Sequence, residues 1–215
     1  MDQIILYSYF RSSASYRVRI VLHYKEIPFE YRAVHLVKDG GMQLKPEYQK
    51  LNPMCQVPLL VDGTFSITQS MAMILYLEEK FPQNPIMPKD LKMRAVAMEL
   101  SEMINSGIQP LQNISVTAEL GTRYNQSKDS QAEWIKFWIE KGMRAFEQKI
   151  SKTAGKYSLG DNISIVDCFL IPQITSSIRF GVDVSKFPTC LNVYNNCQEL
   201  APFQKASPGQ QPDSE

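Results

Sequence analysis

A proline-rich stretch from Phe81 to Pro88 divides the chain into two parts with different sequence patterns. Its three prolines interrupt any regular hydrogen-bonded element. Before it, short apolar runs typical of strands alternate with helical patterns, whereas no later segment convincingly predicts a strand. A chain of 215 residues is long enough for one domain or two. The stretch therefore places a domain boundary after residue 84.

The first part predicts an α/β domain with a mixed sheet and helices on its faces. Asp62 and Gly63 form a turn signal between two short strands, which indicates a hairpin. The predicted order is strand 4–10, helix 12–26, strand 29–37, short helix 45–52, strand 57–62, strand 64–67 and helix 71–81.

The second part, residues 85–205, predicts a bundle of helices. Apolar residues recur at helical spacing over 91–106, 131–150 and 165–180, and the middle segment carries Trp134, Phe137, Trp138 and Phe146 on roughly one stripe. Ser164 and Asp167 have the form of a capping box that starts the last of these helices. Residues 206–215 are polar and rich in proline and serine, which predicts a flexible tail.

The charge balance and the cysteines exclude several functional classes. Twenty-three basic and 22 acidic residues leave a net charge of +1, which favours neither nucleic acid nor a membrane surface as partner. The first ten residues lack the pattern of a signal peptide or a membrane span, so we expect a cytoplasmic protein. Four cysteines without a paired or metal-type spacing predict neither a disulfide framework nor a metal site.

Positive charge is nevertheless concentrated around the start of the first predicted helix. Arg11, Arg17, Arg19 and Lys25 occur between residues 2 and 26, where no acidic residue intervenes. Serines at 12, 13 and 15 add hydroxyl groups at a helix N-terminus, where free amides and the helix dipole attract anions. The segment predicts a local anion site; taken alone, it is also compatible with a capped helix whose arginines face solvent.

Two further features suit ligand binding in the same domain. Gln69 and Ser70 stand at the start of the helix 71–81, and no capping glutamate follows three residues after Ser70, which leaves first-turn amides for a ligand carboxylate. Val57 and Pro58 stand at the head of a strand, where proline cannot donate to the ladder. From sequence alone the trans peptide bond is the default there.

The segment Tyr7–Ile20 is similar to the signature of zeta-class glutathione transferases, also called maleylacetoacetate isomerases, whose usual form is SSCSWRVRI. The resemblance covers nearly the whole chain. It continues through Lys38–Gly41, Leu51–Met54, Gln56–Pro58, Gln69–Ser70, Tyr76–Glu79, Gly107–Asn113 and Gln211–Asp213.

The resemblance implies a thioredoxin-like domain, residues 1–84, that holds glutathione and a helical domain, residues 85–205, that completes the substrate pocket. It also implies a homodimer and a cis bond before Pro58. Carried over residue by residue, the glutathione contacts are Ser12, Ser13, Ala14, Ser15, Tyr16, Arg17, Gln43, Val57, Pro58, Gln69, Ser70, Gln109, Asn113, Ile114 and Ser115.

The resemblance also implies catalytic roles for the serine pair. One serine donates a hydrogen bond to the glutathione thiolate, and we favour Ser12, with Ser13 capping the helix; the reverse assignment stays open. Ser70 and its helix amides take the γ-glutamyl carboxylate, and the backbone of Val57 pairs with the cysteinyl part. No general base is required for this activation.

Two positions of the signature depart from the usual form, with Ala14 in place of cysteine and Tyr16 in place of tryptophan. Without a thiol at residue 14, a mixed disulfide with glutathione cannot form there, which excludes redox chemistry at that position. Isomerisation uses the thiolate of glutathione itself, so it is compatible with Ala14.

The implied activity is glutathione-dependent isomerisation of maleylacetoacetate to fumarylacetoacetate in tyrosine and phenylalanine breakdown. Arg11 and Arg179 are our candidates for the carboxylates of this small anionic substrate. One alternative keeps glutathione but conjugates or dehalogenates electrophiles such as α-halo acids, as in detoxification. Another is a non-catalytic binding module, which would be expected to lose Ser12 or the Gln69–Ser70 pair.

Overall fold

The computed structural model describes residues 3–215 and contains two compact units. The first comprises the chain up to Pro85 together with Glu199–Glu215, and the second is Ile86–Gln198. The first break therefore lies next to the boundary predicted after residue 84. The second break was not predicted.

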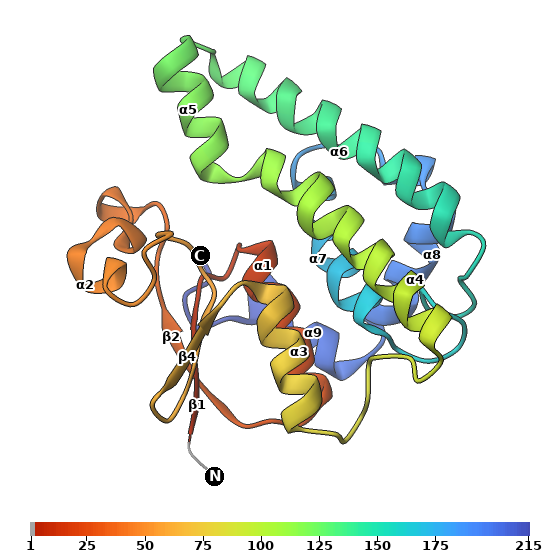
Figure 1. The fold of residues 1–215 in the computed structure, drawn as a ribbon. Coiled ribbons are helices and arrows are strands. Elements are labelled where there is room, and N and C mark those ends of the chain that lie inside the picture. Colours follow the sequence, from red (N-terminus) through yellow and green to blue (C-terminus); the bar gives the residue numbers. More distant parts are fainter. Residues whose placement is uncertain (1–2) are drawn as a thin grey trace. The chain divides into compact units, whose positions relative to one another are not determined.

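The first unit contains a four-stranded mixed sheet, as the sequence predicted (Figure 1). Its strands are β1 (Ile4–Ser8), β2 (Phe29–Ala33), β3 (Leu59–Asp62) and β4 (Phe65–Thr68), in the order β2-β1-β3-β4. β1 runs parallel to β2 and antiparallel to β3, and β3 pairs antiparallel with β4. The βαβ connection thus brings the end of β1 to the start of the first helix.

Four α-helices accompany this sheet: α1 (Ser13–Tyr24), α2 (Pro46–Gln49), α3 (Ser70–Lys80) and α9 (Ala201–Ala206). α1 packs against α3 and against α9. The buried side chains of α1 include Val18, Ile20 and Leu22, none of which is exposed to solvent. Burial of one such side chain contributes about 1.5–3 kcal/mol, so these side chains fix the position of α1.

The segment after α9 corrects the expectation of a flexible tail. Gln211 is buried, and its side-chain amide donates to the backbone oxygens of Lys205 and Ser207, both at 2.8 Å. Asp213 bonds to residues of β2 and of the turn after β1. Composition marked these residues as too polar to fold alone, but they are ordered by specific hydrogen bonds to the first unit.

A buried lysine anchors the end of the first unit. The Lys25 ammonium lies 2.6 Å from a carboxylate oxygen of Glu78 and donates to the carbonyls of Phe81, Gln83 and Asn84 at 2.8, 3.0 and 3.3 Å. A buried charge needs such partners, because desolvation without them is costly. Lys25 thus holds the proline-rich stretch against the first unit.

Within its described residues, the second unit contains helices and no strand; the connection between residues 151 and 163 forms isolated β-bridges. It contains α4 (Leu91–Glu102), α5 (Ile114–Tyr124), α6 (Lys128–Ile150), α7 (Ile165–Arg179) and α8 (Pro188–Gln198), with a π-helical turn at Met103–Ile108. Its core includes Ile104, Met143, Phe146 and Phe169.

The start of α7 bears out the predicted pairing of Ser164 with Asp167. The backbone N–H and the hydroxyl of Ser164 both donate to one carboxylate oxygen of Asp167, at 2.7 and 2.9 Å. The other oxygen accepts from the Ser158 backbone at 2.9 Å. These bonds satisfy a fully buried carboxylate, so the box has a structural role.

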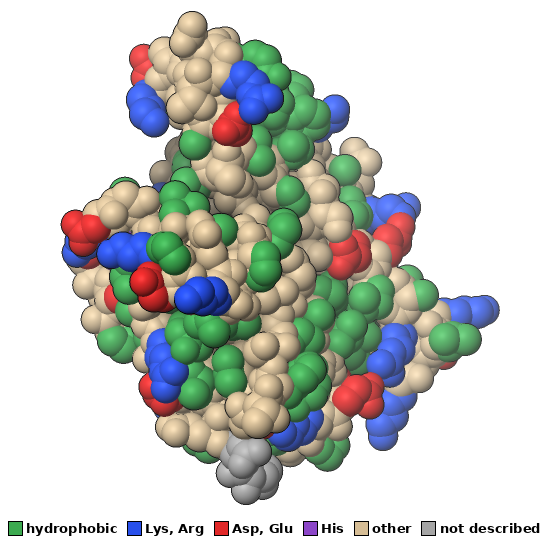
Figure 2. All heavy atoms as spheres, turned by 60° about the vertical axis from the view of Figure 1, so that its left-hand side comes forward, with side chains coloured by type: hydrophobic (Ala, Val, Ile, Leu, Met, Phe, Trp, Pro, Cys, Tyr) green, Lys and Arg blue, Asp and Glu red, His purple; other side chains and the backbone are tan. Residues whose placement is uncertain are grey.

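Charged side chains of both signs are interspersed on the face shown in Figure 2, in keeping with the near-zero net charge. Within residues 3–215, no helix is both long and apolar enough to cross a membrane.

Candidate functional site

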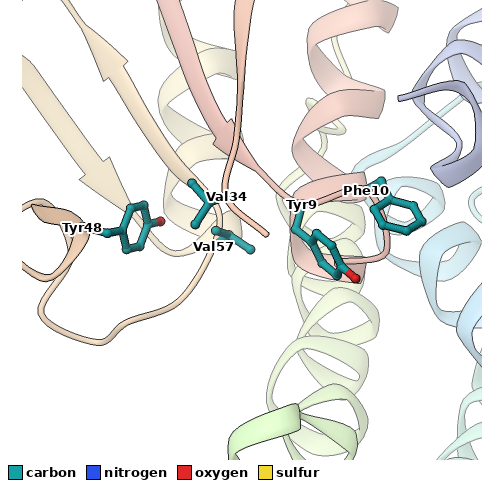
Figure 3. Close-up of a cluster of buried hydrophobic side chains, with 5 residues drawn as sticks. All are labelled: Tyr9, Phe10, Val34, Tyr48 and Val57. Atoms are coloured by element: carbon teal, nitrogen blue, oxygen red, sulfur yellow. The ribbon is translucent and has the colours of Figure 1, made fainter. Parts of the chain in front are cut away.

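The turn between β1 and α1 is built on a small apolar cluster (Figure 3). Tyr9 and Phe10 are buried, and their ring centroids are 4.8 Å apart in an edge-to-face arrangement. The cluster is completed by Val34, Tyr48 and Val57. It connects the turn before Ser12 with the loop before β3, and each of these segments leads into predicted ligand contacts.

Ser12 is the N-cap of α1. Its hydroxyl oxygen accepts the Ser15 amide at 3.1 Å, and its own N–H donates to the Tyr9 carbonyl at 3.0 Å. This corrects the assignment of Ser13 as the capping residue, because Ser13 is the first residue of the helix. A hydroxyl that accepts one hydrogen bond still has its proton to donate. Ser12 can therefore cap the helix and donate to an anion.

The first turn of α1 presents free amide donors. The amides of Ser15 and Tyr16 have acceptors, whereas those of Ser13 and Ala14 find none among residues 3–215. Ala14 is half-buried in this turn. These amides and the positive end of the helix dipole make the turn suitable for a thiolate or carboxylate.

The Tyr16 side chain is directed elsewhere. It is buried, and its hydroxyl donates to the carbonyl of Phe203, a residue of α9, at 3.2 Å. Tyr16 was one of the predicted glutathione contacts in this turn, but its side chain packs α1 on α9. The substitution of tryptophan by tyrosine lies on this packing face.

The start of α3 forms a second group of donors. Gln69 has a positive φ of 73° and does not cap the helix with its side chain. Met73 is the first residue of α3 whose amide reaches a backbone carbonyl, that of Gln69 at 3.0 Å. The buried Ser70 hydroxyl accepts from the Arg17 guanidinium at 3.1 Å. This bond joins the two predicted anion-binding helix starts.

The Val57–Pro58 peptide bond is cis, as the resemblance implied. The preceding loop is fixed at the Gln56 carbonyl, which accepts from the Tyr48 hydroxyl and from the Asn52 side-chain amide, both at 2.7 Å. The loop therefore enters the apolar cluster at Val57 with a fixed backbone.

Two buried oxygen atoms among the predicted contacts lack hydrogen-bond partners within the described residues. They are the Ser15 hydroxyl and the Oε1 atom of Gln43. The Gln43 amide nitrogen donates to the Leu36 carbonyl at 3.2 Å. Gly41, at a φ of 93°, leaves room for this side chain, since a Cβ there would lie 2.6 Å from the Gln43 nitrogen. Buried acceptors without partners are rare in proteins and suit a polar ligand.

The remaining predicted glutathione contacts belong to the second unit. Gln109 begins a 3₁₀ turn directly after the π-helical turn, and Asn113 is the N-cap of α5, accepting the Ser115 amide at 3.4 Å. Ile114 is 48% exposed. Arg179 is the last residue of α7, and its guanidinium stacks on the Phe180 ring with 4.5 Å to the centroid.

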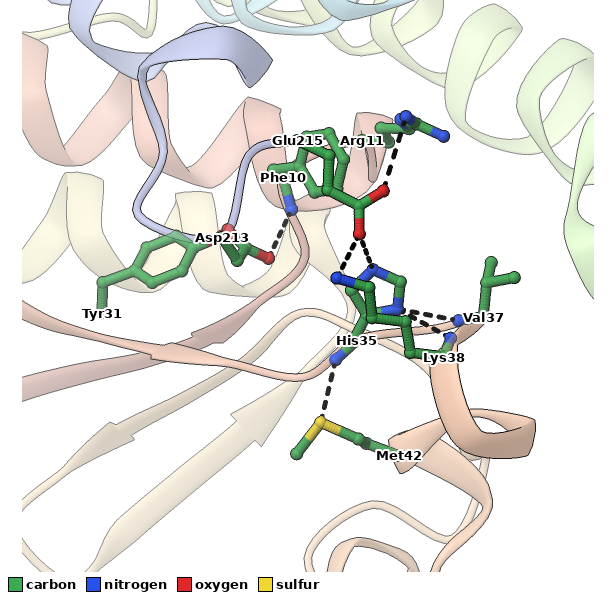
Figure 4. Close-up of polar contacts among 9 residues, drawn as sticks. All are labelled: Phe10, Arg11, Tyr31, His35, Val37, Lys38, Met42, Asp213 and Glu215. Carbon is green, nitrogen blue, oxygen red and sulfur yellow. Dashed lines mark hydrogen bonds and ion pairs between the residues drawn. The ribbon is translucent and has the colours of Figure 1, made fainter.

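Arg11 lies in a cationic group that meets one carboxylate of the chain itself (Figure 4). The Glu215 side chain approaches Lys38 Nζ at 2.5 Å, His35 Nε2 at 3.3 Å and Arg11 at 4.0 Å. The hydrogen bond from Lys38 holds the pKa of Glu215 below its usual range. His35 Nδ1 accepts the Lys38 amide at 2.9 Å, which fixes the ring.

Two of the four predicted cations have structural roles instead. Lys25 binds the proline-rich stretch, as described above. Arg19 is buried and donates to backbone carbonyls of the β1–α1 turn, and burial lowers its pKa to about 10. The sequence pattern could not separate cations that serve a ligand from cations that serve the backbone. It also gave no role to Asp213 and Tyr31, although Asp213 falls within the family resemblance.

Comparison with known protein families agrees with this geometry. Residues 11–80 match the glutathione S-transferase N-terminal domain, and residues 116–209 match the corresponding C-terminal domain. A probable maleylacetoacetate isomerase 2 of Drosophila melanogaster is 44% identical over 211 residues, which cover 98% of this chain and 90% of that protein. The maleylacetoacetate isomerase of Mus musculus is 44% identical, covering 98% of this chain and 94% of its own.

Solved structures give the same relationship. A bacterial zeta-class maleylpyruvate isomerase superposes with a TM-score of 0.95 at 36% identity, covering 98% of this chain and 100% of the other. The maleylacetoacetate isomerase of Anaeromyxobacter dehalogenans, solved with glutathione in its active site, has a TM-score of 0.89 at 40% identity, covering 99% of this chain and 98% of the other. The chain belongs to the glutathione S-transferase family, and within it to the zeta class of maleylacetoacetate isomerases.

Proposed function

We propose that the protein catalyses the glutathione-dependent cis–trans isomerisation of maleylacetoacetate to fumarylacetoacetate, a step in tyrosine and phenylalanine breakdown. The observation that carries the proposal is the N-capping Ser12, whose hydroxyl stands at a helix start with free amides. The names of the relatives, which include several maleylacetoacetate isomerases, support the substrate.

The residues of the first unit fit glutathione. Its cysteinyl sulfur would face Ser12, its γ-glutamyl carboxylate would bind Ser70 and the first amides of α3, and the Val57 backbone would pair with its peptide. The unpartnered oxygens of Ser15 and Gln43 supply further polar contacts. The family resemblance implies further glutathione contacts from Gln109 and residues 113–115.

When bound, glutathione supplies a thiolate that adds to the cis double bond and is expelled after rotation about the resulting single bond. Ser12 stabilises the thiolate by donating its hydroxyl proton in a charge-assisted hydrogen bond. Lowering the thiol pKa from about 8.5 by about two units requires about 2.7 kcal/mol. One such bond together with the N-terminus of α1 can supply an energy of that size.

Arg11 and Arg179 would bind the carboxylates of the substrate. Arg11 directly precedes Ser12 and is exposed, so it is available beside the thiol site. Arg179 ends α7 and is also exposed. A guanidinium matches the geometry of a carboxylate. Each arginine would therefore orient the substrate without taking part in proton transfer.

We also propose that the protein acts as a homodimer in the cytoplasm. The family resemblance supports the dimer. All four cysteines are free, and three of them are buried, which suits a reducing compartment. Light scattering coupled to size-exclusion chromatography tests the dimer, and cell fractionation tests the location.

The decisive experiment follows the loss of maleylacetoacetate with and without glutathione. We expect turnover only with glutathione, and S-methyl glutathione, which cannot form a thiolate, should not replace it. Parallel assays with an α-halo acid separate isomerisation from dehalogenation. Turnover of maleylacetoacetate without glutathione, or of the halo acid alone, would overturn the proposal.

A further inference from the structure

The chain's last residues hold the turn that carries the proposed thiol-activating serine. Residues 199–215 belong to the first unit, and α9 packs on α1. Beyond α9, the chain reaches the β1–α1 turn at Phe10, two positions before Ser12 (Figure 4). The contact is made by Asp213.

Both carboxylate oxygens of Asp213 are used. Oδ2 accepts the Phe10 backbone N–H at 3.1 Å, and Oδ1 accepts the Tyr31 hydroxyl at 2.6 Å. Tyr31 lies in β2 opposite Leu6 of β1, so it ties the carboxylate to the sheet. Burial, followed by the hydrogen bond to Asp213, raises the pKa of Tyr31, which keeps the phenol protonated as a donor. Asp213 is thereby fixed by the sheet and in turn fixes the amide of Phe10.

Arg19 holds the same peptide segment from the carbonyl side. Its guanidinium donates to the carbonyls of Tyr9 at 3.2 Å and Phe10 at 3.1 Å, and to Ala206 at 2.9 Å. Phe10 is thus bound at its N–H by Asp213 and at its oxygen by Arg19. The Tyr9 carbonyl also receives the Ser12 N–H, so the fixed segment leads directly to the N-cap.

We propose that Asp213 is a positioning residue for the Ser12 hydroxyl, acting through the amide of Phe10. The proposal rests on the proposed function, since it assigns Asp213 to the same thiol site. Tyr31 orients Asp213, and Arg19 restrains the opposite side of the peptide. Loss of the Asp213 carboxylate releases the Phe10 amide, and the Ser12 hydroxyl then samples orientations that do not reach the sulfur.

The readout is the pKa of the glutathione thiol in the binary complex, followed by the ultraviolet absorbance of the thiolate. In Asp213→Ala we expect this pKa to rise by about one unit, which leaves about tenfold less thiolate at a pH below both values. At neutral pH, which lies between a wild-type thiol pKa of about 6.5 and the raised value, the thiolate fraction and the kcat measured with saturating glutathione should both fall about threefold. It should recover as the pH is raised through the new thiol pKa, which a general loss of structure would not produce.

Two matched variants complete the test. Tyr31→Phe removes the group that orients the same carboxylate but leaves the Phe10 bond, so we expect a lower Tm and a rise in the thiol pKa that is smaller than in Asp213→Ala. Asp213→Asn keeps an oxygen that can accept the Phe10 amide, so it should restore most of the thiol pKa. Asp213→Ser repeats the measurement if the alanine variant does not fold, because a short polar side chain suits this half-buried position.

The outcomes separate this inference from the proposed function. An unchanged thiol pKa in a folded Asp213→Ala or Asp213→Ser variant would overturn the role of Asp213. A thiol pKa in Asp213→Asn as high as that in Asp213→Ala would also overturn it, because restoring an acceptor for the Phe10 amide would then have no effect. A wild-type protein that does not lower the pKa of bound glutathione would contradict the proposed function instead.

Discussion

The Arg17 guanidinium donates a hydrogen bond to the Ser70 hydroxyl across 3.1 Å, joining the first turns of α1 and α3. Both residues are buried, with exposed fractions of 1% and 5%. Each helix start has amides that find no acceptor among residues 3–215, so one side-chain bond connects the two places where an anion is favoured. The proposed thiol and γ-glutamyl sites are therefore held at a fixed separation.

Ser70→Ala should weaken the binding of glutathione more than it slows the chemistry. The substitution removes a proposed carboxylate donor and one acceptor of a buried guanidinium, which costs about 1–3 kcal/mol in stability. We expect KM for glutathione to rise about tenfold while kcat at saturation changes less. Ser66→Ala on exposed β4 is the matched control. Equal KM values in the two variants would remove Ser70 from the carboxylate site.

Ser12→Ala should lower glutathione-dependent isomerisation at least about tenfold, because the thiolate loses its hydrogen bond. It also removes the N-cap of α1, at a cost of about 1 kcal/mol in unfolding free energy. Ser12→Thr keeps a capping hydroxyl and should retain both stability and a measurable rate. Ser13→Ala should have a smaller effect than Ser12→Ala. A larger loss in the Ser13 variant would reverse the assignment between the two serines.

Glu147 gives the second unit a pH-dependent contact between α6 and α8. Its carboxylate accepts the backbone amides of Thr189 at 2.8 Å and Cys190 at 3.0 Å. Burial alone would raise the pKa of Glu147, but these hydrogen bonds outweigh burial and hold the pKa below its usual range. A lowered pKa means that the stabilisation is complete above the unfolded-state value of about 4.3 and is lost as the pH falls through the folded-state value.

Glu147→Gln should therefore lower the unfolding free energy by about 1–2 kcal/mol at pH 7, and the difference should shrink as the pH falls below about 4. Urea titrations at several pH values measure it. Glu133→Gln, on an exposed position of the same helix, removes the same charge without a comparable contact. A difference between the Glu147 variant and wild type that stays constant down to pH 3 would show that the charge of Glu147 is not involved.

Local patterns were sufficient to predict the order of strands and helices from β1 to α3, because apolar alternation and the Asp62–Gly63 turn determine them directly. The same patterns failed where tertiary contacts determine which side chains are buried. α6 buries Ile135, Ile139 and Met143, whereas Phe137 of the predicted aromatic stripe is 55% exposed. Helices α5, α8 and α9 were not predicted.

Site residues at a helix N-terminus were predictable from sequence. The hydrogen-bond partners of individual charged side chains were less predictable. Ser12 and Ser70 stand at helix starts, which sequence can identify. Arg19 and Lys25 have the same sequence signal as Arg11, but burial directs them to backbone carbonyls. The role of Asp213 depends on a contact with Phe10 from the other end of the chain, which no local pattern contains.

Glu215→Gln should strengthen the binding of an anionic substrate. The Glu215 carboxylate shares the cationic group of Lys38, His35 and Arg11, and it approaches the guanidinium proposed for a substrate carboxylate to 4.0 Å. The hydrogen bond from Lys38 lowers the pKa of Glu215, and the same bond raises the pKa of Lys38. Both groups therefore stay charged across neutral pH, and the glutamate competes with an incoming carboxylate.

We expect KM for maleylacetoacetate to fall about two- to threefold in Glu215→Gln at low ionic strength, which is the size of an exposed ion pair. The effect should diminish at high salt, because the contact is exposed and screened. Glu199→Gln removes the same charge at an exposed position of the same C-terminal segment and should leave KM unchanged. If KM is unaltered in Glu215→Gln, or if both variants lower it equally, Arg11 does not bind the substrate carboxylate in competition with Glu215.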